Sequence, residues 1–374
     1  MATVSESAET RPHAPAAIST DRTVWAAVAL TVLAAGLRLP GLGAQSYWFD
    51  ESVTVWLTHF SLPGMLAVIP ANESTPPLYY VLAWLWSHLW GTGEAGLRSL
   101  SALAGVATVP VAYATARRLW SGRAALIAAA LTACNPLLIW YSQEARAYSL
   151  VVLLTAGCLL AGAHLRDRVD RGWAATWVAC AGLALATHYF ALLVVVPQWL
   201  WLAIRYRRDR RMRIALELVV AVALLLAPLA AAQLVGQQGA HSWMRSVSLA
   251  HRIADVPRTF ALGPAAPAAR WLRVAIAVAT GIAGWLAWTR TSRRERAGIG
   301  LMLGLAAAAT VIVALLIAAG YDELDYRNML VVWLPCALAL AGGLGARRAG
   351  RVGVTAALVI CAVGVGTAVA VWAD

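Results

Sequence analysis

Long apolar runs separated by short arginine-rich connections constrain this chain more than any other feature. Of its 374 residues, 61% are hydrophobic and 13% are charged, whereas soluble domains carry about 25% charged residues. One membrane span takes roughly 20 apolar residues, and the runs provide about eleven such segments. The sequence therefore predicts an all-α, multi-pass protein in a lipid bilayer, with spans at 23–40, 96–118, 123–141, 145–165, 172–188, 190–205, 213–233, 270–289, 297–319, 328–346 and 351–372.

The arginines give these spans an orientation. All 30 basic residues are arginine, and most of them lie in the short connections at 117–123, 166–171, 205–213, 290–296 and 347–351. The positive-inside rule makes this side the cytoplasm. The clusters do not form one continuous basic face, so the formal charge of +12 does not predict nucleic-acid binding. The richness in arginine, alanine, valine and glycine suggests a bacterial chain, and hence the bacterial plasma membrane.

The non-cytoplasmic side has one long connection early in the chain, residues 41–95. Within it, residues 76–90 are apolar but only about 15 long, rich in tryptophan and opened by two prolines. These properties favour a helix lying along the membrane surface over a span. We expect a disordered cytoplasmic N-terminus at 1–22 and one membrane domain at 23–374, with a second outer loop at 234–269.

The first outer connection carries two adjacent carboxylates, Asp50 and Glu51, directly after Tyr47, Trp48 and Phe49. Carboxylates in an aromatic setting at a membrane boundary are costly unless a site uses them. A partly buried carboxylate within reach of a hydroxyl can act as a general base, and Asp50 is the candidate. The alternative is a helix-capping role, because Asp is a favoured N-cap residue.

Other charged or polar residues also fall at the outer ends of spans. Glu144 and Arg146 lie in the turn between two apolar runs, and Arg327 opens a late span. An arginine can bind a phosphate through two hydrogen bonds, and a glutamate can bind a sugar hydroxyl. An ion pair with another loop would equally explain Arg146, and neighbouring acids could neutralise Arg327. His188 and Tyr189 close an outer hairpin, either as ligand contacts or as interfacial anchors.

The order of these motifs resembles a known family. FDE (49–51) is followed by PPLYY (76–80), LRSLSALAG (97–105), SQEARAY (142–148), HYF (188–190) and a late Arg327 with Pro335 beyond it. This order resembles the GT-C superfamily of integral-membrane glycosyltransferases, specifically the family 39 or protein-mannosyltransferase-like branch, which includes the aminoarabinose transferases. The resemblance implies a GT-C-type bundle of about 11 transmembrane helices. In that bundle the long first outer loop, with its interfacial helices, carries catalysis.

The resemblance also implies roles for individual residues. Asp50 matches the catalytic base with Glu51 beside it, and Tyr79 and Tyr80 line the acceptor site, where Trp48 is also expected. Glu144 and Arg146 match the donor-binding motif, and Arg327 matches an arginine for the lipid phosphate; His188 and Tyr189 join this donor-binding set. Two features depart from the family: Thr75 stands where many relatives have histidine before PPLYY, and the 234–269 loop replaces a large late domain.

The implied activity is an inverting transfer of mannose or another pentose or hexose from a polyprenyl-phosphate donor. The acceptor would be a cell-envelope glycan, a glycolipid or a protein on the outer face of the membrane. No cofactor is expected; a divalent metal is compatible with the outer acids, but no ligand spacing calls for one. The alternative is a transporter or flippase of a lipid-linked sugar, a class typified by mid-span ionisable residues and broken helices, which are scarce here.

Overall fold

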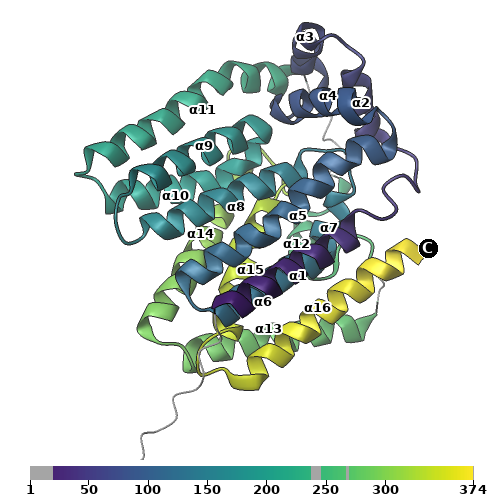
Figure 1. The fold of residues 1–374 in the computed structure, drawn as a ribbon. Helices are drawn as coiled ribbons and strands as arrows, with labels where there is room; N and C mark the ends of the chain where they lie inside the picture. The colour runs from purple at the N-terminus through teal and green to yellow at the C-terminus, as the bar shows by residue number, and fades with distance from the viewer. Residues whose placement is uncertain (1–19, 237–245, 267–268, 374) are drawn as a thin grey trace, which may run out of the picture.

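The computed structural model describes residues 20–236, 246–266 and 269–373, and throughout these ranges the regular structure is helical (Figure 1). The expected disordered segment 1–22 lies almost wholly outside the described residues, as does part of the 234–269 loop. The helices are α1 (Thr20–Arg38), α2 (Phe49–Thr58), α3 (Leu62–Asn72), α4 (Leu78–Trp90), α5 (Glu94–Leu119), α6 (Gly122–Cys134), α7 (Pro136–Ser142), α8 (Tyr148–Leu165), α9 (Arg171–Thr187), the 3₁₀ turn η1 (Tyr189–Ala191), α10 (Leu192–Arg205), α11 (Arg210–Gly236), α12 (Leu249–Leu262), α13 (Arg270–Thr289), α14 (Arg293–Ala318), α15 (Leu330–Leu344) and α16 (Gly350–Ala373).

Every expected span coincides with a helix or a pair of helices, which confirms the all-α, multi-pass prediction. Six helices of the described chain are long and apolar enough to cross a membrane, namely α5, α8, α11, α13, α14 and α16. The pair α6 and α7, bent by 55°, makes a seventh if it counts as one span. The remaining expected spans correspond to α1, α9, α15 and the 189–205 segment, so length and composition do not establish the count of eleven.

The arginine-rich connections meet at one end of the bundle. Arg118 Nη2 lies 2.6 Å from Asp167 Oδ2, which joins the end of α5 to the end of α8. Trp120 Nε1 donates to the Glu295 carbonyl at 3.0 Å, and the Arg347 backbone N–H donates to Glu295 Oε1 at 3.2 Å. These contacts bring four of the five clusters together, as the positive-inside pattern predicts.

Helices α2, α3 and α4 lie together beyond the opposite end of the bundle (Figure 1). Helix α11 starts at the arginine-rich end and finishes beside α3, where Gln233 Nε2 donates to the Thr75 carbonyl at 2.9 Å. The segment expected to lie along the membrane surface becomes α4, whose 13 residues fall outside the candidate spans. The 41–95 connection therefore forms a helical cap over one end of the bundle.

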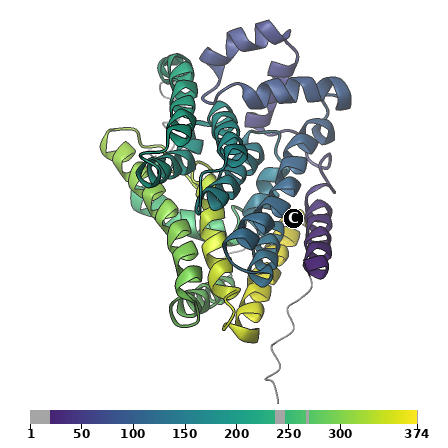
Figure 2. The same cartoon turned by 60° about the vertical axis from the view of Figure 1, so that its left-hand side comes forward.

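Helix α15 forms the centre of the bundle. It is hydrophobic all round and buried along most of its length, as a helix of that pattern must be. Figure 2 shows α14 beside α15, and α6 and α13 also pack against α15. Because α15 begins just after Arg327, its burial fixes that arginine against the cap.

A buried arginine supports the break between α6 and α7. Pro136 has no N–H, so the carbonyl four residues earlier, that of Thr132, loses its helical partner. Arg38, the last residue of α1, is fully buried and donates to the carbonyls of Thr132 at 2.9 Å and Ala133 at 2.8 Å. Its Nε also donates to Ser142 Oγ at 3.2 Å. The side chain of one helix thus satisfies the backbone groups that the proline leaves open in another.

Candidate active site

Asp50 lies in the first turn of α2, where a carboxylate interacts favourably with the positive end of the helix dipole. The N-cap residue is Trp48, not Asp50. The Asp50 side chain is 28% exposed, and its Oδ2 lies 3.4 Å from Arg327 Nη1. The capping alternative therefore does not account for Asp50, and its carboxylate is accessible from the capped end of the bundle.

Arg327 lies in the connection before α15, and Asp325, two residues earlier, orients its side chain. Asp325 Oδ1 accepts from the Arg327 backbone N–H at 2.9 Å and lies 3.4 Å from its Nε. The Arg327 side chain is 20% exposed, similar to that of Asp50. A cation and a carboxylate from opposite ends of the sequence thus share one partly open site.

Glu51 does not share this site with Asp50, contrary to the sequence expectation. It is fully buried, and its two oxygens accept from Arg98 Nε at 2.8 Å and Arg98 Nη2 at 2.6 Å. It also accepts from the Ala145 N–H at 2.7 Å and the Trp48 N–H at 3.3 Å. Two adjacent residues in the first turn of a helix point about 100° apart, so one side chain can be buried while the other stays open. Glu51 fastens α2 to α5 and to the 143–147 turn.

Arg146 is also bound within the protein. Its Nη1 and Nη2 donate to Glu73 at 2.8 and 3.3 Å, and Nη1 donates to the Asp50 carbonyl at 3.1 Å. The residue is only 8% exposed, and its guanidinium lies over the Tyr80 ring. The ion pair with another loop, left open by the sequence, is the arrangement found. Arg146 holds the backbone of the residue whose side chain faces Arg327.

Glu144 differs from the other buried acids because half of its carboxyl group is unsatisfied. Trp140 Nε1 donates to Oε1 at 2.6 Å, whereas Oε2 is buried and has no hydrogen-bond partner among the described residues. Burial raises the pKa of Glu144 to about 8, opposed by the Trp140 hydrogen bond. A neutral carboxyl group with one open oxygen can donate a hydrogen bond as well as accept one.

His188 and Tyr189, expected to bind the donor, contact the protein itself. His188 is buried, and its Nδ1 accepts from the Phe190 N–H at 3.2 Å. Burial, together with the charges of Arg146 and Arg327, lowers the pKa of His188 to about 3, so the ring is neutral. Tyr189 donates to Gln233 Oε1 at 2.5 Å, which ties the outer hairpin to α11.

The two tyrosines expected at the acceptor site lie inside the cap. Tyr79 and Tyr80 are 0% and 1% exposed, and their hydroxyls bond to Ser101 at 3.0 Å and Thr75 at 2.9 Å. They face the protein rather than an opening, so their position contradicts direct acceptor contact. Trp48 is 41% exposed at the start of α2, two residues from Asp50. Of the three aromatic candidates, Trp48 alone can meet a ligand without rearrangement.

The described residues contain no group of three or more His, Cys, Asp or Glu side chains that could hold a metal ion. The prediction that no cofactor is required stays a prediction. The candidate site consists of the partly exposed Asp50–Arg327 pair and the Glu144 carboxyl group, of which one oxygen has no hydrogen-bond partner among the described residues. Two buried ion pairs hold the surrounding loops.

Comparison with known proteins places this site in a familiar fold. Residues 74–231 match the family model described as dolichyl-phosphate-mannose-protein mannosyltransferase. ArnT from Cupriavidus metallidurans, solved with undecaprenyl phosphate, aligns over 87% of this chain at 16% identity, with a TM-score of 0.59. The chain has the GT-C fold. The fold class expected from the sequence is confirmed, and the match of residues 74–231 to this family model agrees with the resemblance noted in the sequence.

This chain covers 60% of that ArnT structure, so it spans less than two thirds of its length. In the apo state the same ArnT aligns over 87% of this chain at 17% identity, with a TM-score of 0.52. An oligosaccharyltransferase from Archaeoglobus fulgidus, solved with Zn and sulfate, aligns over 92% of this chain and 53% of its own, at 14% identity and a TM-score of 0.50. A search of the curated proteins finds no significant match.

Sequence reasoning missed three residues that hold the GT-C site together. Arg98 and Arg38 bind across helices, and Glu73 binds Arg146. The sequence did indicate that the two arginines are bound within the protein, because Arg98 falls within an expected span and Arg38 lies near the end of another. A charge there must find a partner. The sequence does not show which residue the partner is, because the partner lies far away along the chain.

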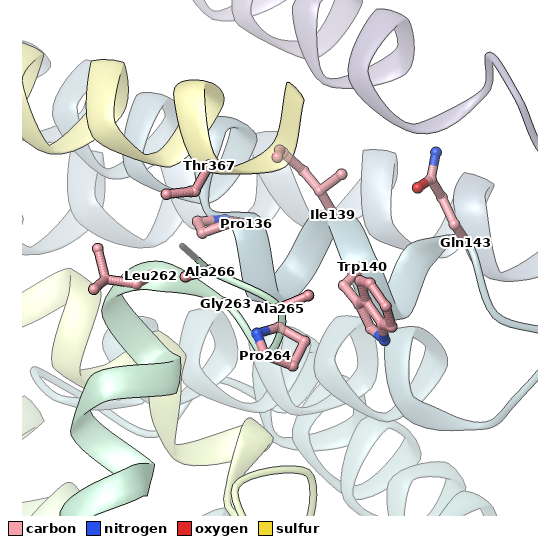
Figure 3. A pocket seen from close by; sticks show the side chains of 11 residues that line it. Pro136, Ile139, Trp140, Gln143, Leu262, Gly263, Pro264, Ala265, Ala266 and Thr367 are labelled. Atoms are coloured by element: carbon pink, nitrogen blue, oxygen red, sulfur yellow. The ribbon is translucent and has the colours of Figure 1, made fainter. Parts of the chain in front are cut away.

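A small apolar cavity adjoins the site on the side of Trp140 (Figure 3). It lies between α7, the 263–266 connection and the end of α16, and the labelled Trp140 and Ile139 face it. Its volume is about 20 Å³, enough for about one water molecule. Trp140 lines this cavity and also donates a hydrogen bond to Glu144. The cavity therefore places apolar surface next to a buried carboxyl group.

Proposed function

We propose that this GT-C protein transfers a sugar from a polyprenyl-phosphate donor to a hydroxyl acceptor on the non-cytoplasmic face of a bacterial plasma membrane. The observation that carries the proposal is the Asp50–Arg327 pair, which joins an accessible carboxylate to an accessible guanidinium 3.4 Å away. The pair lies at the end of the bundle opposite the arginine-rich connections. The positive-inside rule makes that opposite end extracytoplasmic, where a lipid carrier is a suitable sugar donor.

The proposed reaction is a single displacement with inversion at the anomeric carbon. Asp50 accepts the proton of the acceptor hydroxyl while the acceptor oxygen forms a bond to that carbon. The bond from the carbon to the phosphate oxygen breaks, and its electron pair leaves with the polyprenyl phosphate. Arg327 stabilises the growing negative charge on the phosphate, so the leaving group needs no acid catalyst.

The ion pair also suggests an order of events. While Arg327 lies beside Asp50, its guanidinium occupies the Asp50 oxygen Oδ2. A bound donor phosphate would compete for the Arg327 guanidinium and draw it toward the phosphate. The Asp50 carboxylate would then be free to accept a hydrogen bond from the acceptor hydroxyl when the donor is in place. Proton abstraction is thereby linked to donor binding.

Glu51 and Arg146 act through position in this proposal, and Glu144 acts through a contact with the donor. Glu51 fixes the first turn of α2 through Arg98, and Arg146 holds the Asp50 carbonyl while bound to Glu73. Neither guanidinium is assigned to the leaving phosphate. Glu144 is neutral near pH 7, and its buried Oε2 has no partner among the described residues. It is assigned a hydrogen bond to the donor sugar, which must displace the side chains that cover this oxygen. Mannose and arabinose both offer hydroxyls for such a contact, and the acceptor can be a glycan, a glycolipid or a protein.

Purified protein in lipid nanodiscs, supplied with envelope glycans, glycolipids and proteins as acceptors, would test the proposal against a panel of polyprenyl-phosphate sugars. Mass spectrometry would follow release of polyprenyl phosphate and formation of the glycosylated product. We expect release with at least one donor, and loss of release in Asp50→Asn. Asp255→Asn is the matched control, because this acid pairs with Arg258 on α12 rather than with Arg327. Unchanged release in Asp50→Asn would exclude Asp50 as the base.

The same samples distinguish an enzyme from a flippase of lipid-linked sugars. In proteoliposomes, a flippase moves the intact donor between leaflets without releasing polyprenyl phosphate. Donor movement with no release for any sugar in the panel would contradict the transferase proposal.

A further inference from the structure

A groove separates α10 from α11 at the arginine-rich end, far from the Asp50–Arg327 site. Its volume is about 490 Å³, within the range typical of small-molecule sites. Trp199, Ala203 and Leu216 contribute apolar surface, and Trp199 Nε1 donates to the Leu216 carbonyl at 3.2 Å, which joins the two helices. The groove is therefore a built feature of two packed helices, not a gap between unconnected ones.

The groove has the length of one membrane leaflet. Along α11 its lining runs from Arg213 to Leu224, which at about 1.5 Å per residue spans roughly 16 Å. Half of the hydrocarbon core of a bilayer measures about 15 Å. Leu224 is 67% exposed and Val220 is 41% exposed, so this wall offers apolar side chains along its depth. One acyl chain of the nearer leaflet matches these dimensions and this chemistry.

The entrance of the groove is cationic. Arg207 and Arg213 line it, within a stretch that also contains Arg205, Arg208, Arg210 and Arg211. The acid of this stretch, Asp209, is used in capping α11, where Oδ1 accepts from the backbone N–H groups of residues 211 and 212. Glu217 also lines the groove, but it is 66% exposed and lies 3.8 Å from Arg213 Nε. Arg207 has no hydrogen bond or ion pair with any residue that the structure describes.

We infer that this groove binds an anionic phospholipid of the cytoplasmic leaflet. The phosphate of the headgroup lies between Arg207 and Arg213, and one acyl chain runs along α11 toward Leu224. Arginines at the cytoplasmic surface attract anionic headgroups, each contributing on the order of 1 kcal/mol. The apolar depth selects a lipid over a free phosphate ion, and the cationic entrance selects an anionic lipid over a zwitterionic one.

Native mass spectrometry of the full chain, released from detergent, would test this inference with phosphatidylglycerol and phosphatidylcholine as probes. We expect retention of phosphatidylglycerol with a preference of roughly 10- to 30-fold, the effect of two arginines. The double variant Arg207→Gln, Arg213→Gln should lose the preference. The matched control is Arg348→Gln, Arg351→Gln, which removes two exposed arginines from another connection at the same end.

A second variant tests the apolar part of the groove. Ala221→Trp fills the groove while leaving both arginines in place, and it should reduce lipid retention as strongly as the arginine variant. Ala277→Trp, on an exposed face of α13, should leave retention unchanged. Equal retention of the two lipids, an undiminished preference in the arginine variant, or displacement of the lipid by inorganic phosphate would each overturn the inference. None of these readouts depends on sugar transfer.

Discussion

Asp50 and Arg327 are separated by 277 positions in the sequence, yet their side chains lie 3.4 Å apart at the capped end of the bundle. One belongs to the cap helices and the other to the start of the central helix α15. Both remain partly exposed, in contrast to the buried pairs Glu51–Arg98 and Arg146–Glu73. The three pairs therefore divide into one that can exchange partners with a ligand and two that hold the loops in place.

Replacing Arg327 by glutamine should weaken donor binding. A hydrogen bond to a charged group contributes about 1.5–3 kcal/mol, so affinity for polyprenyl phosphate should fall roughly 10- to 150-fold. Titration of the lipid phosphate by microscale thermophoresis would measure this. Arg258→Gln, which removes an outer arginine paired with Asp255, should bind as the wild type does. Equal affinity in the two variants would remove Arg327 from the donor site.

Replacing Arg98 by methionine should destabilise the protein, because it leaves Glu51 buried without its cation. Breaking a buried pair by removing one partner typically costs about 3–5 kcal/mol. Thermal unfolding in detergent should show a large loss, and Glu51→Gln, which keeps the shape, should lose less.

Asp167→Asn provides the comparison for the Arg98 variant. Its carboxylate is 53% exposed in a pair with Arg118, and a pair of this kind contributes about 1 kcal/mol or less. Similar losses for the exposed and the buried pair would contradict the assignment of Glu51 as a structural anchor.

Arg38→Met should also reduce stability, through a different mechanism. The variant leaves the carbonyls of Thr132 and Ala133 buried without donors, which costs about 2–4 kcal/mol. Thermal unfolding of Arg117→Met, an exposed arginine on α5, should differ from wild type by no more than about 0.5 kcal/mol. If both variants unfold at the same temperature, the break at Pro136 does not depend on Arg38.

Glu144 should make stability depend on pH. Its pKa is raised to about 8 in the folded protein, against 4.5 in the unfolded chain, so the folded state holds the proton more tightly. The stabilisation is complete below about pH 4.5 and is lost as the pH rises through about 8. The melting temperature of the wild type should therefore fall between pH 5 and 9 more steeply than that of Glu144→Gln. Parallel pH profiles for the two proteins would show that Glu144 does not hold this proton.

The fold was readable from the sequence because the membrane imposes it. Apolar length and arginine position place the helices, and each expected span, including 96–118 and 328–346, coincides with a helix. The break at Asn135–Pro136 within 123–141 was not expected, because the sequence does not show that Arg38 can satisfy the opened backbone. Hydropathy reports the surrounding solvent but carries no information on which helices are neighbours.

The candidate site could be predicted from the sequence only in part, because the sequence does not show which side chains are neighbours. Asp50 and Arg327 were both named from their positions at the outer ends of apolar runs. Glu51 and Arg146 were named by the same reasoning, yet they are buried against Arg98 and Glu73. Whether a boundary charge faces a ligand or a partner depends on long-range contacts, and a single sequence does not reveal these. Tyr79 and Tyr80 illustrate the same ambiguity for aromatic side chains.

The central claim is that Asp50 takes the proton of the acceptor while Arg327 stabilises the departing phosphate. The most direct measurement is the single-turnover rate of Asp50→Asn at saturating donor, with donor affinity measured on the same preparation. The account predicts a rate lowered by about 10²- to 10⁴-fold, the usual contribution of a general base, with donor affinity retained. A wild-type rate in Asp50→Asn, or a loss explained entirely by weaker donor binding, would contradict it.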